Sequence, residues 1–276
     1  MNLLILSDKI DPLALESIAE LTCARSITPV GPQAFRLLDA QPHEALPAWC
    51  EAAAVDHVWI AADRHLSDFG LFVTDMDSTL IDIECIDEIA DMQGLKPQVA
   101  EITEAAMRGE IDFRESLTRR VGLLAGLHEE ALEEVYSQRL HLNPGAELLM
   151  QGLQQANIRT VLVSGGFTYF TERLQRRLGF DHAYANQLEV DQGRLTGRVV
   201  GDIVDGEAKA AHLIRIRDEL GLAPAQVIAA GDGANDIPML QAAGFGVAFR
   251  AKPVLRTVAD CSLDHSGLDG ILSLFA

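Results

Sequence analysis

Three short segments of the sequence place acidic, hydroxyl or glycine residues directly after apolar runs. They are residues 75–79 (DMDST), 164–166 (SGG) and 231–236 (GDGAND). In an open parallel sheet, ligands bind in the crevice beyond the carboxyl ends of the strands, so residues that follow apolar runs are the first candidates for a site. The three segments could therefore meet at one site.

The two carboxylates at Asp75 and Asp77 lie two residues apart after the apolar run 71–74. Neighbouring carboxylates raise each other's pKa unless a cation lies between them. Mg²⁺ would resolve this repulsion, because it prefers oxygen ligands and keeps several waters that a substrate phosphate can replace. We predict Asp75 and Asp232 as the metal pair. A single Asp after a strand is also typical of a turn or helix cap, but two such clusters favour the metal.

Ser164 and the two glycines after it offer a hydroxyl and unobstructed backbone N–H groups. We expect them at the start of a helix, where the helix dipole favours a bound anion. The pattern indicates a phosphate seat, although the same letters also form a tight turn into a helix. Lys209 is one of only four lysines and begins a helical pattern. It could supply a positive charge, but taken alone it is typical of a solvated surface lysine.

The order Asp75-x-Asp77-x-Thr79, Ser164, Lys209 and Gly231-Asp232-Gly233-x-x-Asp236 resembles the four motifs of the haloacid dehalogenase-like phosphohydrolases. More narrowly, the letters DMDST, SGGF and GDGAND are similar to those of the phosphoserine phosphatases, from about residue 71 to the C-terminus. The resemblance implies hydrolysis of O-phospho-L-serine to L-serine and inorganic phosphate, the last step of serine biosynthesis. It also implies an aspartyl-phosphate intermediate, which splits one difficult displacement into two.

The resemblance assigns a role to each motif residue. Asp75 would be the nucleophile and Asp77 the general acid and base, which protonates the leaving serine oxygen and then deprotonates the attacking water. Mg²⁺ would be held by Asp75, the main-chain carbonyl of Asp77, and Asp232. The phosphate-binding residues would be Ser164 and Lys209. Gly165 and Asn235 would contact the substrate, and Asp236 would support the site.

Substrate choice should come from a helical segment between the first two motifs, at about residues 85–142, acting as a cap. Phosphoserine carries an ammonium and a carboxylate besides its phosphate, so a selective site needs an acid and a base. The resemblance places them at Glu84 and Arg120, with apolar contacts at Met107 and Phe113. For the two apolar residues, ordinary helix packing explains the sequence equally well.

The residues themselves favour Arg120 more than Glu84. Glu84 begins an acidic stripe that continues at i+3, i+4 and i+7, a pattern also typical of a solvated helix face. Arg119 has Glu115 four residues earlier, whereas Arg120 has no acidic residue at i−3 or i−4 and so lacks a local partner. Arg120 and Phe113 are seven residues apart and should share a helix face.

The elements that must position these residues alternate between strands and helices. Apolar runs predict strands at residues 71–74, 160–163, 227–230 and 246–248, and helical patterns occur at 169–178 and 209–220. This alternation predicts a doubly wound, Rossmann-like α/β core with a parallel sheet covered on both faces. Residues 185–190 and 194–200 flank Asp-Gln-Gly and predict a hairpin.

The first 68 residues predict a separate small unit. Its pattern is strand, helix, strand, strand, helix, strand, at residues 3–6, 12–21, 26–30, 34–38, 43–54 and 57–61. This order favours a ferredoxin-like fold, and the unit resembles the amino-acid-binding ACT domains. Its first strand-to-helix turn has no glycine, which argues against serine feedback through it. We expect an N-terminal domain at 1–68 and a phosphatase domain at 69–276.

Composition limits the classes of partner. The chain has 276 residues and a net charge of −19 from 41 acidic and 22 basic residues, which repels nucleic acids and anionic membranes. A small-molecule substrate is the partner we expect, and a homodimer is compatible with the sequence. The four cysteines form no CxxC pair, and there is no signal peptide pattern or apolar run of about 18 residues. These features favour a cytoplasmic protein.

Three other functions stay open from the residues alone. The chain could hydrolyse another small phosphomonoester, or it could be a phosphoacceptor signalling domain in which Asp75 is phosphorylated. An acid and base at Asp77 argues against the phosphoacceptor, because it would promote turnover of the aspartyl phosphate. A non-catalytic amino-acid sensor would leave four intact motifs unexplained.

Overall fold

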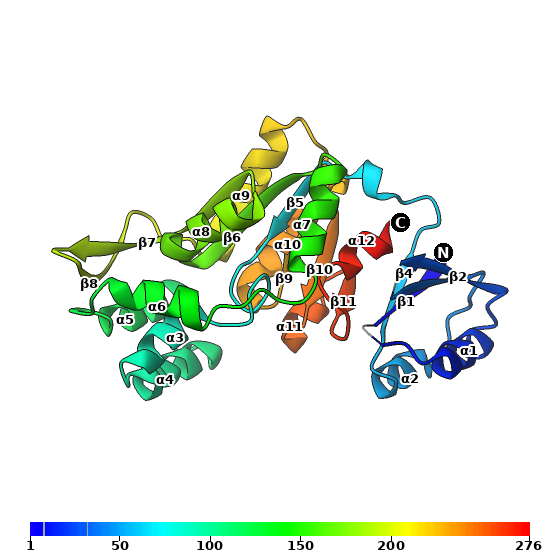
Figure 1. The fold of residues 1–276 in the computed structure, drawn as a ribbon, viewed down its shortest axis with the longest axis horizontal. Coiled ribbons are helices and arrows are strands. Elements are labelled where there is room, and N and C mark those ends of the chain that lie inside the picture. Colours follow the sequence, from blue (N-terminus) through cyan, green and yellow to red (C-terminus); the bar gives the residue numbers. More distant parts are fainter. Residues whose placement is uncertain (8, 32) are drawn as a thin grey trace.

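The computed structural model describes residues 1–7, 9–31 and 33–276. Its N-terminal unit is a four-stranded sheet with the order β2-β3-β1-β4 in which every neighbouring pair is antiparallel (Figure 1). This is the topology of a ferredoxin-like unit, as the order of elements predicted. The elements are β1 (Asn2–Leu6), α1 (Pro12–Leu21), β2 (Ser26–Gly31), β3 (Ala34–Leu38), α2 (Leu46–Ala52) and β4 (Asp56–Ile60).

The central strand β1 is apolar on both faces because it contributes to two cores. Leu3 and Ile5 pack with α1 and α2, whereas Leu4 and Leu6 point to the opposite face and join the core of the larger unit. Alternate residues of a strand face opposite sides of the sheet. The N-terminal sheet is therefore sandwiched between its own helices and the rest of the chain.

The second sheet has seven strands in the order β11-β10-β9-β5-β6-β7-β8. All its pairs are parallel except the hairpin between β7 and β8. The strand order reverses at β5, whose two neighbours are β6 and β9, so the crevice of this doubly wound sheet opens at the end of β5. The strands are β5 (Leu71–Thr74), β6 (Arg159–Phe167), β7 (His182–Asp191), β8 (Arg194–Val200), β9 (Val227–Gly231), β10 (Phe245–Phe249) and β11 (Cys261–Leu263).

Helices cover both faces of this sheet, as predicted. Phe72 of β5 packs into the core that also holds residues of α7, α8 and α12. Its neighbours Leu71 and Val73 face the other way, toward α9 and α10. The helices are α7 (Ala146–Gln155), α8 (Thr168–Leu178), α9 (Gly206–Glu219), α10 (Ile237–Ala242), α11 (Pro253–Arg256) and α12 (Gly270–Leu274), with short 3-10 turns η1 (Leu66–Asp68), η2 (Pro224–Gln226) and η3 (Ala234–Asp236).

Four helices follow β5 and form what we call the cap: α3 (Cys85–Met92), α4 (Lys96–Met107), α5 (Phe113–Gly122) and α6 (Glu130–Gln138). The β7–β8 hairpin lies against them (Figure 1). The amide of Leu195 in β8 donates to the carbonyl of Leu127 at 2.8 Å, and the amide of Gly126 donates back to Leu195 at 2.8 Å. The hairpin itself was predicted, but its packing against the cap was not.

A buried carboxylate joins the N-terminal unit to the larger one. Asp56 of β4 accepts hydrogen bonds from the backbone amides of residues 264–266 at 2.7–3.1 Å and from the hydroxyl of Ser266 at 2.7 Å. Hydrogen bonds to an ionised acceptor are stronger than neutral ones. This contact ties β4 to the loop after β11.

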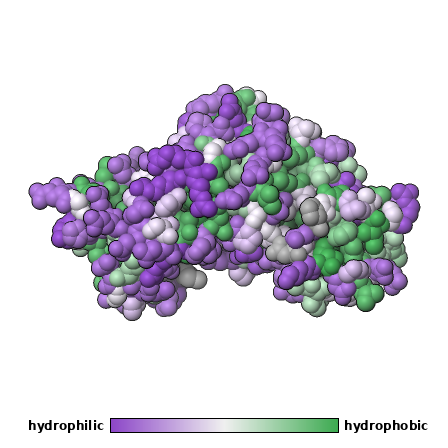
Figure 2. Space-filling view, in the orientation of Figure 1, coloured by the Kyte–Doolittle hydropathy of each residue, from purple (hydrophilic) through white to green (hydrophobic). Residues whose placement is uncertain are grey.

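The visible surface is predominantly hydrophilic over the cap and the hairpin, and hydrophobic side chains are more frequent over the N-terminal unit (Figure 2). None of the helices in the described part of the chain is both long and apolar enough to cross a membrane.

Candidate active site

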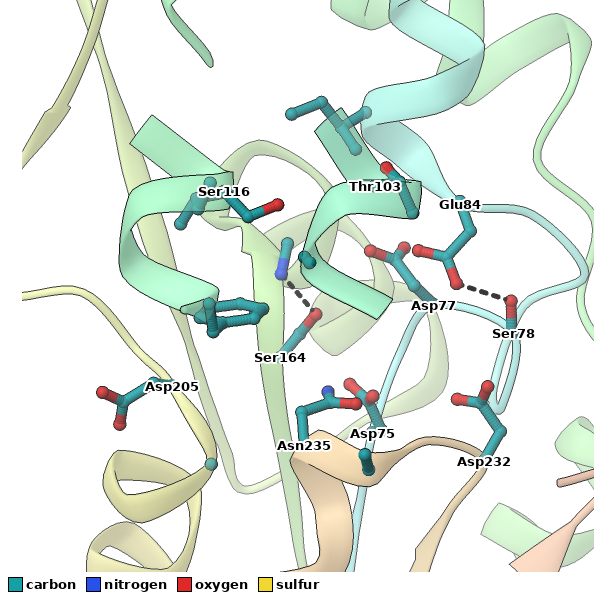
Figure 3. Close-up of a pocket in the computed structure, with 18 of the residues that line it drawn as sticks. Asp75, Asp77, Ser78, Glu84, Thr103, Ser116, Ser164, Asp205, Asp232 and Asn235 are labelled. Atoms are coloured by element: carbon teal, nitrogen blue, oxygen red, sulfur yellow. Dashed lines mark hydrogen bonds between the residues drawn. The ribbon is translucent and has the colours of Figure 1, made fainter. Parts of the chain in front are cut away.

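A cavity of about 1210 Å³ lies between the cap and the carboxyl ends of β5, β6 and β9 (Figure 3). This is the crevice that the strand order predicts. Segments far apart in the sequence meet there, since the cavity is lined by residues from 75 to 254. The lining includes most residues that the sequence singled out: Asp75, Asp77, Glu84, Phe113, Arg120, Ser164, Gly165, Asp232 and Asn235.

Lys209 and Asp236 are completely buried beside this cavity. The Lys209 ammonium contacts Asp75 Oδ2 at 2.7 Å and Asp236 Oδ1 at 2.8 Å. Although burial alone would lower the pKa of Lys209, the carboxylates of Asp236 and Asp75 raise it above its usual value. Lys209 is therefore a fixed cation inside the site and not a solvated lysine, an alternative that the sequence left open.

Three carboxylates, those of Asp75, Asp232 and Asp236, offer oxygen atoms within 4.8 Å of one another. Burial and the charge of Asp236 raise the pKa of Asp75 well above its usual value and that of Asp232 to about 6. One lysine does not neutralise three carboxylates, so the cluster favours a further cation.

The donors fit a hard divalent metal ion. The oxygens of Asp236 accept hydrogen bonds from Lys209 and from the amides of Asp232 and Gly233, and Asp236 does not line the cavity. Asp75 and Asp232 do line it, so these two carboxylates are the ones that a cation in the cavity would meet. The main-chain carbonyl of Asp77 is the third expected ligand. Among the described residues, no backbone amide donates to it, so its oxygen could also face a cation. A set made only of oxygen atoms is the kind that Mg²⁺ prefers.

The carboxyl of Asp77 lies between Asp75 and Glu84, on the cap side of the cavity (Figure 3). Its Oδ1 is buried without a hydrogen-bond partner among the described residues. Burial, followed by the charge of Glu84, raises the pKa of Asp77 to about 8. A carboxyl with a pKa near neutrality can both donate and accept a proton, which suits a general acid and base.

Ser164 lies inside β6, and this corrects the prediction that it starts a helix. Strand β6 continues through both glycines because Phe167 still pairs with Asn186 of β7, and helix α8 begins only at Thr168. The Ser164 hydroxyl accepts a hydrogen bond from the Gly166 amide at 2.8 Å. Ser164 therefore reaches the cavity from a strand end, four residues before the helix.

The two glycines of this segment allow close approach of the backbone to functional side chains. A Cβ at Gly165 would lie 2.8 Å from the Phe113 ring, and a Cβ at Gly166 would lie 2.7 Å from Asp77 Oδ2. Neither position has room for a side chain. The glycines thus let the end of β6 form the floor of the cavity below α5.

The cap contributes Phe113 and Arg120, which both line the cavity from α5, as their spacing predicted. The Arg120 Nε is buried and has no partner among the described residues. Burial lowers the pKa of Arg120, and nearby acidic residues oppose that effect. Arg119 instead forms the predicted surface pair with Glu115. A guanidinium with an unpaired, buried Nε at a cavity wall is suited to receive an anionic group of a ligand.

The acidic stripe at the start of α3 is divided between two environments and is not one solvated face, the alternative that the sequence left open. Glu84 precedes the helix and accepts a hydrogen bond from the Ser78 hydroxyl at 2.9 Å, and Asp87 lines the cavity. The other two acidic residues, Glu88 and Asp91, both contact Arg139 at 2.6 Å. Met107 ends α4, and its side chain lies outside the described residues.

Three residues at or beside the cavity received no individual role from the sequence, although two of them belong to its first motif. Ser78 adopts a left-handed backbone with φ 57° and holds Glu84. Thr79 donates to Asp232 Oδ1 at 3.2 Å. Asp205 caps α9 by accepting from the Ala208 amide at 3.0 Å, and an Asp before a helical pattern is a signal that could have identified it.

Comparison with known proteins identifies the family of the chain. Residues 72–241 match the haloacid dehalogenase-like hydrolase family, and residues 3–46 match a domain of unknown function, DUF4072. The phosphoserine phosphatase of Polaromonas sp. is 53% identical over 217 residues, which cover 77% of this chain and 92% of that protein. The phosphoserine phosphatase of Idiomarina loihiensis is 54% identical over 203 residues, 74% of this chain and 92% of that protein.

Solved structures extend the likeness to the whole chain. The unliganded structure of a probable phosphoserine phosphatase from Vibrio cholerae has a TM-score of 0.87 and 35% identity, and the match covers 99% of this chain and 86% of that one. A substrate-bound phosphoserine phosphatase complex has a TM-score of 0.71 and 38% identity, covering 75% of this chain and 99% of that one. The chain therefore belongs to the haloacid dehalogenase-like hydrolases and, among them, to the phosphoserine phosphatases.

Proposed function

We propose that this chain hydrolyses O-phospho-L-serine to L-serine and inorganic phosphate, the last step of serine biosynthesis. The observation that carries this proposal is that one cavity holds both a phosphate-transfer centre and a recognition surface for an amino acid. Asp75, Lys209 and Asp232 gather at the core side, and Glu84 and the unpaired Arg120 lie at the cap side. A phosphomonoester of a zwitterion matches both sides.

In the first half-reaction, Asp75 attacks the phosphorus and the bond to the serine oxygen breaks. Asp77 gives its proton to that oxygen, so that L-serine leaves as a neutral alcohol. In the second, Asp77 takes a proton from water, the water oxygen attacks phosphorus, and Asp75 is released with inorganic phosphate. The pKa of about 8 at Asp77 supports this exchange of roles, because the carboxyl can hold or release a proton at neutral pH.

The remaining residues bind and stabilise the phosphoryl group. Lys209 holds Asp75 in place and supplies positive charge, while the Ser164 hydroxyl, the Gly165 amide and Asn235 face the phosphate. Mg²⁺ bound by Asp75, the carbonyl of Asp77 and Asp232 would neutralise charge on the phosphoryl oxygens. Asp236 supports the site by holding Lys209 and the amide of Asp232.

The cap residues would recognise the amino-acid part of the substrate. We assign the substrate carboxylate to Arg120, the ammonium to Glu84, and the apolar contacts to Phe113 and Met107. The hydrogen bond from Ser78 to Glu84 supports this orientation. Because burial leaves the Arg120 Nε without a protein partner, a substrate carboxylate would satisfy it.

The proposal also includes the setting of the enzyme. We propose an N-terminal domain at 1–68 and a phosphatase domain at 69–276 with its cap at about 85–142, a division supported by the two separate sheets. A net charge of −19 supports a small-molecule substrate without nucleic acid or membrane partners. A cytoplasmic location and a homodimer remain part of this proposal, and the molar mass in solution tests the dimer.

Phosphate release from a panel of small phosphomonoesters, with Mg²⁺ or with EDTA, tests the function. We expect Mg²⁺-dependent turnover with the highest kcat/KM for phosphoserine, and none for Asp75→Asn, which keeps the shape of the side chain but loses the nucleophile. A higher kcat/KM for another ester in the panel would reassign the substrate. Stable phosphorylation of the protein without phosphate release would favour a phosphoacceptor domain.

A further inference from the structure

Asp87 is a cavity residue to which the mechanism assigns no role. It lies in the first turn of α3 and lines the cavity. The other acidic side chains of the stripe are satisfied, since Glu84 accepts from Ser78, and Glu88 and Asp91 contact Arg139. Asp87 differs, because its Oδ1 is buried without a hydrogen-bond partner among the described residues.

Arg120 is the complementary unsatisfied group in the same cavity. Its Nε is also buried without a hydrogen-bond partner among the described residues. Burial lowers the pKa of Arg120, and the charge of Asp87 is the largest effect that opposes this. Burial raises the pKa of Asp87, and the charge of Arg120 is the largest effect that opposes it. Asp87 and Arg120 thus line one cavity, each with a buried polar atom that has no partner among the described residues, and their charges attract without forming an ion pair.

This separation has a physical consequence for ligand binding. A partly buried guanidinium without any nearby negative charge is unfavourable and would move toward solvent or toward Glu84 and Asp77. A direct ion pair with Asp87 would instead occupy the N–H groups that a ligand needs. A carboxylate that attracts Arg120 but leaves its N–H groups free keeps the guanidinium both in the cavity and available.

We propose that Asp87 is a positioning residue that holds the Arg120 guanidinium in the cavity wall, ready for the carboxylate of the substrate. This inference rests on the proposed function, because it assumes that Arg120 binds that carboxylate. It gives different roles to two acidic residues of the stripe. Glu84 faces the substrate ammonium, and Asp87 acts through Arg120.

Asp87→Asn tests the proposal, because it keeps the shape of the side chain and removes its charge. Three substrates distinguish its effects: phosphoserine, the phosphate ester of 3-hydroxypropanoate, which has a carboxylate but no ammonium, and phosphoethanolamine, which has an ammonium but no carboxylate. For the two substrates that carry a carboxylate, we expect KM to rise by roughly 5- to 50-fold and kcat to stay within about twofold of wild type. Both kinetic constants for phosphoethanolamine should also stay within about twofold of wild type. Asp87→Glu should recover most of the loss.

Two further variants separate positioning from structural damage. Asp91→Asn makes the same change one turn later on α3, where the side chain contacts Arg139, and should leave all three substrates unaffected. In an Arg120→Ala background, Asp87→Asn should cause no additional loss, because the residue through which it acts is gone.

Each other outcome overturns a specific statement. An equal loss on phosphoethanolamine would mean that Asp87 binds the ammonium or that the cap is damaged, and would refute positioning through Arg120. Unchanged KM values for Asp87→Asn would also refute it, while leaving the proposed function intact. A wild-type enzyme that hydrolyses phosphoethanolamine as well as phosphoserine would refute the proposed function itself.

Discussion

Replacing Lys209 with Met removes the cation that joins Asp75 to Asp236 and should destabilise the folded protein at neutral pH. Met has nearly the length and volume of Lys, so packing is preserved while the charge is lost. The Lys209 side chain is 0% exposed and contacts both carboxylates, at 2.7 and 2.8 Å. After the change, three carboxylates within 4.8 Å of one another have no ammonium between them in metal-free protein.

Removing one partner of a buried ion pair typically costs about 3–5 kcal/mol, because the other charge stays buried without compensation. The cost should depend on pH. Lys209 partly offsets the raised pKa values of Asp75 and Asp232, so without it these two pKa values rise further above those of the unfolded chain and the folded state binds more protons. Stability from such groups is present at low pH and is lost as pH rises through the folded pKa. We therefore expect the loss to approach about 3–5 kcal/mol at pH 8 and to be smaller at pH 5.

Urea denaturation in EDTA, followed by circular dichroism at pH 5 and pH 8, measures this difference. Lys96→Met is a matched control, because Lys96 is an exposed lysine at the start of α4 and its loss should change stability by less than about 0.5 kcal/mol. A loss below about 1 kcal/mol for Lys209→Met at pH 8, or a larger loss at pH 5 than at pH 8, would refute the role of Lys209 as the neutralising charge of the cluster.

Asp77→Asn should slow phosphoserine hydrolysis by roughly 10²- to 10⁴-fold. It should slow the hydrolysis of an aryl phosphate less, because a good leaving group needs no proton, and equal losses in kcat/KM for the two substrates would contradict the acid role. Asp56→Ala should lower the free energy of unfolding by about 2–4 kcal/mol in urea titrations, because the amides of residues 264–266 lose their acceptor; a change under about 0.5 kcal/mol would show that water replaces the carboxylate. Finally, the raised pKa values of Asp232 (about 6) and Asp77 (about 8) mean that the folded state binds more protons than the unfolded one, so stability in EDTA should fall from pH 5 to pH 8. Added Mg²⁺ should reduce that slope, and an unchanged slope would argue against a metal at these carboxylates.

Local patterns were sufficient to predict the scaffold and the core of the candidate site. Apolar runs of four or five residues predicted strands such as β5 and β9, because such runs become buried in a sheet covered on both faces. Asp75 and Asp232 follow β5 and β9, and parallel strands end at the same edge of a sheet, so the sequence predicts both residues at one edge. The pairing of β5 with β9 then brings them together. The element order of the N-terminal unit likewise predicted its ferredoxin-like topology.

Interactions between distant segments could not be predicted in the same way. From the sequence alone, Lys209 could lie on an exposed helix face. The packing of α9 against β5 and η3 is what places its ammonium between Asp75 and Asp236. The acidic residues of the stripe follow a single helical period and should share one face. Nevertheless, Glu88 and Asp91 contact Arg139, whereas Asp87 lines the cavity. Periodicity identifies a helix face but not what lies opposite it.

The sequence by itself therefore determined the alternation of strands and helices around the site and the motif residues that could perform phosphoryl transfer, because both depend on local patterns. Tertiary structure decided that β6 extends through Gly165 and Gly166, that the hairpin packs on the cap, and that Asp56 binds the loop after β11. It also left Arg120 and Asp87 unpaired in one cavity. The physical reason is that burial and charge pairing depend on groups brought together across long stretches of chain.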